Sequence, residues 1–175
     1  ELGQAEARNR LGMVERWGEA DINNAESYFN QSLALFLKRE ESWGVAWNLF
    51  HLGSVAIDRN QDESALSLLQ QSLDLYRELG DPWGIARASQ FLGMLYLKQG
   101  DYKKTHFYFD QHLKNDEGLR FMDGVSDALS NFGRLYCLQG DYDLAEKYYQ
   151  KSLATSREYG LMPDIGINLY SLGLL

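Results

Sequence analysis

A glycine preceded by leucine or phenylalanine returns about every 40 residues, and this period constrains the fold more than any other feature of the sequence. The spacings between successive pairs are 41, 40, 40 and 40 residues. The pairs are Leu11-Gly12, Leu52-Gly53, Leu92-Gly93, Phe132-Gly133 and Leu172-Gly173. A period of this length indicates an array in which one supersecondary unit is copied and stacked.

Each unit contains two amphipathic helical patterns and no strand pattern. In the third unit, Asp81 as N-cap and Pro82 after it predict a first helix that ends near Gly100. Asp101 then predicts the N-cap of a second helix, whose apolar residues fall on one face. The sequence therefore predicts an all-α solenoid of antiparallel helix pairs, with nine helices in about four and a half repeats.

The same period predicts the domain organisation. We expect one array with units at residues 3–41, 42–81, 82–121 and 122–161 and a half unit at residues 162–175. Neither end carries the polar capping helix that such arrays need for solubility. The simplest expectation is that the array is a fragment of a larger protein. The alternative is a homo-oligomer that stacks through the uncapped ends.

Glycines inside the predicted first helices need a packing reason, because each costs about 1 kcal/mol relative to alanine. We expect Gly93 to face Thr105, and Gly133 to face Ala145, so that small residues let two helices approach closely.

The repeated columns resemble the tetratricopeptide repeat. The resemblance rests on the Leu-Gly pair, on a tyrosine three residues after the glycine (Tyr96, Tyr136), and on small and aromatic residues in the second helix. The period exceeds the usual 34 residues and is similar to the longer repeats of kinesin light chain, Pins-type adaptors and bacterial regulators. The resemblance covers essentially the whole chain and implies a right-handed superhelix. His112 departs from it, because it stands where a small residue is expected.

Composition and motifs argue against several classes of function. A net charge of −8 disfavours nucleic acid as a partner, and no apolar run approaches the roughly 20 residues that span a bilayer. The single cysteine, Cys137, is compatible with a cytoplasmic location. The three histidines lack metal-ligand spacing, and no phosphate loop or nucleophile motif occurs. We therefore expect no membrane partner, no cofactor and no catalysis.

The first helices present a second set of positions that share one face but vary from unit to unit, which we call the variable face. Stacked helix pairs curve, so this face should line a concave groove that binds a protein or peptide segment. Four arginines against two acids give the face a net charge of +2, which favours acidic residues in the partner. The predicted partner-binding residues are Asn9, Arg10, Trp47, Phe50, His51, Arg87, Gln90, Phe91, Met94, Asn131, Arg134 and Tyr170.

These residue types suggest particular roles in binding. We expect arginines such as Arg87 and Arg134 to pair with carboxylates, amides such as Gln90 to hold a peptide backbone, and Trp47 and Phe50 to accept apolar side chains. Three alternatives remain open. The same residues could pack helix to helix, the domain could sense a small ligand within a bacterial transcriptional or signalling regulator, or the array could be a self-assembling structural element.

Overall fold

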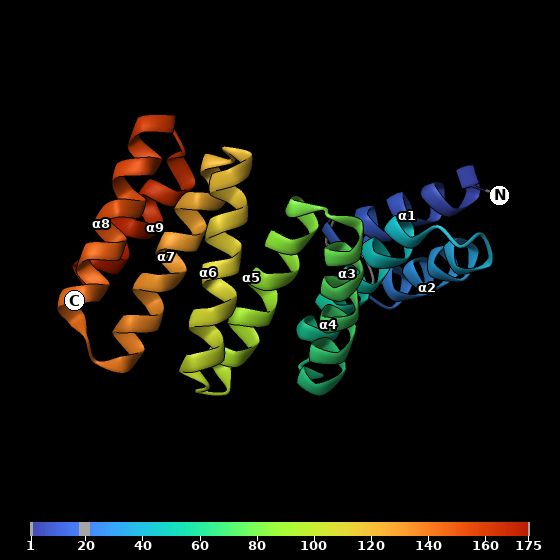
Figure 1. The fold of residues 1–175 in the computed structure, drawn as a ribbon, viewed down its shortest axis with the longest axis horizontal. Helices are drawn as coiled ribbons and strands as arrows, with labels where there is room; N and C mark the ends of the chain where they lie inside the picture. The colour runs from blue at the N-terminus through green and yellow to red at the C-terminus, as the bar shows by residue number, and fades with distance from the viewer. Residues whose placement is uncertain (1, 18–21, 175) are drawn as a thin grey trace. The chain divides into compact units, whose positions relative to one another are not determined.

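The computed structural model describes residues 2–17 and 22–174, and these residues form nine α-helices and no strand (Figure 1). This confirms the predicted all-α fold class. The helices are α1 (Leu2–Trp17), α2 (Ile22–Lys38), α3 (Ser42–Asp58), α4 (Asp62–Leu79), α5 (Pro82–Lys98), α6 (Tyr102–Leu119), α7 (Met122–Gln139), α8 (Tyr142–Tyr159) and α9 (Met162–Gly173).

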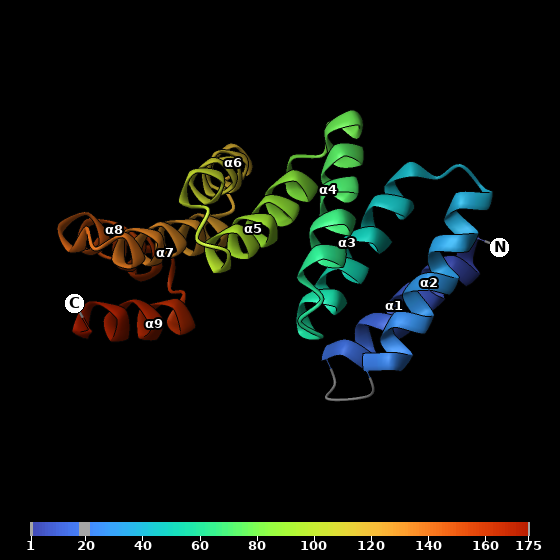
Figure 2. The same ribbon diagram turned by 90° about the horizontal axis from the view of Figure 1, so that it is seen from below.

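The chain divides into two compact units, residues 1–84 (unit 1) and residues 85–175 (unit 2). In unit 1, α2 packs between α1 and α3, and α3 also packs on α4. In unit 2, α7 packs between α6 and α8, and α9 lies against α8 and α7 (Figure 2). Within each unit, these helices that follow one another in sequence pack on one another, as expected of an array of helix pairs. The repeat boundaries proposed above stay a prediction.

Predicted caps and turns set the ends of the helices. The Asp101 carboxylate accepts a hydrogen bond from the Lys104 amide at 3.1 Å, and the Asp141 carboxylate accepts one from the Leu144 amide at 3.1 Å. Several helices are followed by a residue in the left-handed conformation, which glycine adopts without strain. The glycines in this conformation are Gly80, Gly100, Gly140 and Gly160, and the other residues are Glu40, Asn60 and Arg120.

Gly93 and Gly133 face aromatic rings, which corrects the expectation that they face small residues. A β-carbon on Gly93 would lie 2.5 Å from the ring of Phe109, and one on Gly133 would lie 2.7 Å from the ring of Tyr149. The missing side chain thus makes room for a ring from the second helix. Phe109 is fully buried and belongs to the core of unit 2.

Replacing Gly133 with leucine should overpack this contact and lower the free energy of unfolding by about 1–3 kcal/mol or more. Urea unfolding followed by circular dichroism measures the change. Gly118→Leu is the matched control, because a β-carbon on Gly118 of α6 meets no atom within 4 Å. Equal stability of the two variants would contradict this packing.

Candidate functional site

A pocket of about 410 Å³ is formed in unit 1 by residues of α1, α2 and α3. It is lined by Glu6, Asn9, Arg10, Met13, Phe36, Trp43 and Trp47. Three predicted partner-binding residues, Asn9, Arg10 and Trp47, thus line one pocket. Phe36 and Trp43 also line it and are not among the predicted residues.

Trp47 is held in place by rings on both sides and by a hydrogen bond. Its ring stacks on Trp43 with centroids 5.2 Å apart and on Trp83 with centroids 5.3 Å apart. Its Nε1 donates to Asn9 Oδ1 at 2.9 Å, and Asn9 Nδ2 donates to Asn48 Oδ1 at 3.1 Å. The indole cannot turn without losing these contacts, so this wall of the pocket is already formed in the absence of a partner.

The chemistry of the pocket is an apolar floor with charges of both signs beside it. Met13, Phe36 and the two indoles supply the apolar surface, while Glu6 and Arg10 are exposed side chains of α1. A concave apolar site with a few polar groups at its edge is the usual form of a binding site.

Two other predicted residues of unit 1, Phe50 and His51, lie in the core. They are 6% and 3% exposed, respectively. The His51 ring stacks on Phe29 with centroids 4.9 Å apart and meets the edges of Trp47 and Phe50. These two side chains are therefore not accessible to a partner in this structure. Asn9, at 8% exposed, contributes through its hydrogen bond to Trp47.

His51 is held in the neutral form. Burial, assisted by the positive charge of Arg16, lowers the pKa of His51 from 6.5 to about 3. Neither ring nitrogen of His51 has a hydrogen-bond partner among the residues that the structure describes, so the imidazole serves here as an aromatic packing element.

In unit 2, the guanidinium of Arg87 is already paired within the chain and is not available to a partner's carboxylate. Its Nη2 contacts the Asp116 carboxylate and lies 2.9 Å from His112 Nε2. His112 Nε2 lies 2.9 Å from Asp116 Oδ2. The Arg87 side chain is 17% exposed, while His112 and Asp116 are fully buried. The predicted pairing of Arg87 with a partner is therefore replaced by an internal ion pair.

Polar side chains continue from Arg87 across the variable face of unit 2. Arg87 Nη1 donates to Gln90 Oε1 at 3.1 Å, and Gln90 Nε2 donates to Asp127 Oδ2. Asn131 Nδ2 also donates to Asp127 Oδ2, at 3.2 Å. Burial raises the pKa of Asp127, and the nearby His112 and Arg87 partly oppose that shift. The structure thus joins three predicted residues, Arg87, Gln90 and Asn131, in one network.

The remaining predicted residues differ in accessibility. Met94 is 38% exposed on α5, Arg134 is exposed on α7, and Tyr170 is 70% exposed on α9. Phe91 is half-buried. These residues do not line the pocket of unit 1 that contains Trp43 and Trp47, which we call the tryptophan pocket.

His112 and Asp116 belong to this network, although neither was predicted as a site residue. Comparison of equivalent positions in the repeats could have identified them. His112 occupies the position that serine holds in the other units, as Ser72 does, and Asp116 occupies the position of Phe36 and Tyr76. A charged residue in a column whose other members, Phe36, Tyr76 and Ser156, are uncharged is a visible departure.

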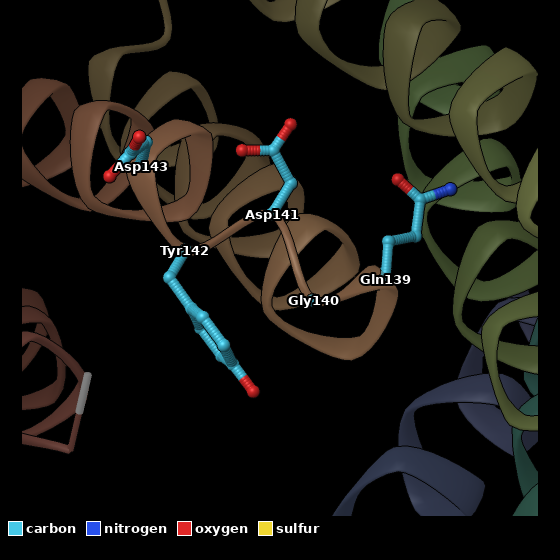
Figure 3. A pocket seen from close by; sticks show the side chains of 5 residues that line it. All are labelled: Gln139, Gly140, Asp141, Tyr142 and Asp143. Atoms are coloured by element: carbon cyan, nitrogen blue, oxygen red, sulfur yellow. The ribbon is translucent and has the colours of Figure 1, made fainter.

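A second hollow lies at the turn between α7 and α8, where the labelled Tyr142 side chain points away from Asp141 and Gln139 (Figure 3). Its lining is one short stretch of chain, residues 139–143. Asp141 is already engaged as the N-cap of α8, and Tyr142 is 57% exposed. We assign no ligand to this turn.

Two further classes of site find no support in the described part of the chain. Residues 2–17 and 22–174 contain no group of three His, Cys, Asp or Glu side chains placed to hold a metal ion. No helix within these ranges combines the length and the apolar composition that crossing a bilayer requires.

Two family models, both described as tetratricopeptide repeat, match the sequence over residues 3–78 and residues 125–159. Among curated proteins, none matches the sequence.

Several solved structures are similar in fold. Aspartyl phosphate phosphatase F from Bacillus subtilis superposes with a TM-score of 0.90 at 16% identity, over 97% of this chain and 44% of its own. A Rap protein complexed with Competence and Sporulation Factor gives 0.87 at 23% identity, over 95% of this chain and 46% of its own. Nearly identical TPR-like repeats of kinesin light chain type from Podosopora anserina give 0.76 at 14% identity, covering 98% and 85%. This chain spans less than half the length of the first two.

Proposed function

Because the chain belongs to the tetratricopeptide repeat family, we propose that it is a non-catalytic interaction scaffold that binds a segment of another protein. The observation that carries this proposal is the tryptophan pocket of unit 1, whose wall is built before any partner arrives. Preformed pockets lined by aromatic residues supply much of the binding energy at interfaces, because little conformational entropy is lost there on binding.

The pocket indicates how a segment would bind. Apolar side chains of the segment would enter beside Trp43, Trp47 and Met13, and its charged or polar groups would meet Arg10 and Glu6. The complex of a Rap protein with Competence and Sporulation Factor supports the idea that an array of this fold holds a partner.

The proposed preference for an acidic partner rests on the exposed arginines. Arg10 and Arg134 are exposed, whereas Arg87 is engaged with Asp116. We therefore propose that Arg10, which lines the pocket, and not Arg87, attracts the carboxylates of the partner. Such rim charges chiefly accelerate association and weaken with added salt.

The test is selection of a displayed random peptide library on the purified chain, followed by fluorescence anisotropy of each enriched peptide. Trp43→Ala should weaken the enriched peptides by about 2 kcal/mol, or roughly 30-fold, because Trp43 is a 49% exposed aromatic wall of the pocket. Phe107→Ala is the matched control, since Phe107 is a 50% exposed aromatic on α6 that does not line this pocket.

Two outcomes bear on different parts of the proposal. If Trp43→Ala binds the selected peptides as tightly as the wild type does, the pocket is not the binding site. Arg10→Glu tests the acidic preference separately: it should weaken peptides rich in aspartate and glutamate about tenfold at low salt. Unchanged binding of those peptides would remove the electrostatic element and leave the apolar one.

A further inference from the structure

Three residues of the third repeat, each different from its equivalent in the repeat before it, contact one another. In the repeat before it, the equivalent residues are Trp47, Ser72 and Tyr76. In the third repeat they are Arg87, His112 and Asp116, which we call the charged cluster. Independent drift at three positions would not be expected to produce three mutual partners in one buried place.

The residues equivalent to His112 are serines in the other repeats, namely Ser32, Ser72 and Ser152. Their hydrogen bonds show which contact His112 replaces. Ser72 Oγ donates to the Ala46 carbonyl at 2.8 Å, and Ser152 Oγ donates to the Ser126 carbonyl at 2.7 Å. Ser32 makes the same bond to Ala5, at 2.8 Å. His112 instead lies 2.9 Å from the Arg87 guanidinium. A bond repeated three times is thus exchanged for a charged contact at one place.

Asp116 likewise replaces an aromatic ring, since its equivalents in the first two repeats are Phe36 and Tyr76. Glycines near the start of α3 and α5, Gly44 and Gly84, leave room for the rings of Phe36 and Tyr76. The equivalent glycine of α7, Gly124, leaves room for the Asp116 carboxylate. The close approach to the glycine is kept, but the side chain that occupies the space changes from an aromatic ring to a carboxylate.

Stability does not explain this exchange. A buried ion pair is often no better, and frequently worse, than apolar residues of similar volume. Within the described ranges, the cluster also leaves Asp116 Oδ1 and His112 Nδ1 buried without hydrogen-bond partners, and such groups are costly. Buried ionic groups retained at this cost are best known for specifying which elements pair.

We propose that the charged cluster is a pairing determinant that specifies α5 as the first helix against which α6 packs. The other joints use interchangeable contacts, serine to carbonyl and ring to glycine, so copied helices could pair out of order or with a second copy of the chain. Placed against any other first helix, α6 would carry the Asp116 carboxylate into the core without Arg87. That arrangement costs more than a mismatched apolar contact. This proposal is independent of the peptide-binding function.

The test converts the third repeat to the residues of the second, with Arg87→Trp, His112→Ser and Asp116→Tyr combined in the full chain. The thermal midpoint should rise by about 3–10 °C, since the ionic joint becomes apolar. Refolding from urea at several protein concentrations, followed by size-exclusion chromatography with light scattering, should show several-fold more dimer and larger species than the wild type.

A matched control and a second variant keep the test decisive. Lys114→Gln with Asp110→Asn removes an ion pair of 2.7 Å on the exposed surface of the same helix and should refold like the wild type. If the triple variant does not fold, Arg87→Met with Asp116→Leu makes the same comparison. A stabilised variant that refolds to monomer as cleanly as the wild type would overturn the proposal. A cluster-free variant with a lowered thermal midpoint would overturn it too.

Discussion

Replacing Arg87 with glutamine is expected to lower the free energy of unfolding by about 3–5 kcal/mol, because the change leaves a buried carboxylate without its cation. Asp116 is fully buried, and the guanidinium of Arg87 is the cation that contacts it. Glutamine keeps some hydrogen-bonding capacity but no charge. The guanidinium also lies 5.6 Å from the centroid of the Phe121 ring, and the variant loses that contact.

Equilibrium unfolding in urea at neutral pH measures this effect. Arg134→Gln is the matched control, because Arg134 belongs to the same variable face but is exposed, so its loss should change stability by no more than about 0.5 kcal/mol. A small effect at Arg87, equal to that at Arg134, would show that the ion pair with Asp116 is not a buried constraint.

Replacing His51 with phenylalanine is expected to remove about 3 kcal/mol of acid-induced destabilisation between pH 7 and pH 4. The pKa of His51 is lowered from 6.5 to about 3 in the folded chain, chiefly by burial. The unfolded chain therefore takes up a proton as the pH falls below 6.5, while the folded chain resists uptake until about pH 3. The contribution of this group is complete above pH 6.5 and is lost progressively between pH 6.5 and pH 3.

The free energy of unfolding at several pH values, measured for the wild type and for His51→Phe, tests this sign. The phenylalanine ring keeps the stack on Phe29 and the contacts with Trp47 and Phe50. His106→Phe is the control, because His106 is exposed to solvent and should leave the acid dependence in place. The same acid dependence in wild type and His51→Phe would mean that His51 takes up its proton without penalty.

The helical architecture could be predicted from the period and the turn residues. Asp101 and Asp141 cap helices as expected, and Gly100 and Gly140 take the left-handed conformation after α5 and α7. These features depend on neighbours in the sequence, so one sequence suffices to find them. The glycine columns marked close contacts correctly, but the partner of Gly133 is Tyr149 and not Ala145, because a helix rotates by 100° per residue and a short offset changes the facing side chain.

The candidate site was predictable only in part. Arg10 and Trp47 line the pocket as predicted residues of the variable face, yet Phe50 and His51 of the same face are buried. All four fit one helical spacing. Whether a side chain at that spacing meets solvent or a neighbouring ring depends on residues far away in sequence, such as Phe29 beside His51.

By itself, the sequence determined the class of the molecule: a 40-residue period with caps and turn glycines admits little other than stacked helix pairs. Only the tertiary structure decided which charged side chains are paired inside the chain and which are exposed to solvent. Arg87 and Arg134 look alike in the sequence, one turned inward onto Asp116 and the other exposed. The reason is that burial and pairing of a charge depend on side chains brought close by the fold, 29 residues away in the case of Asp116, whereas helix formation depends on residues within a turn or two.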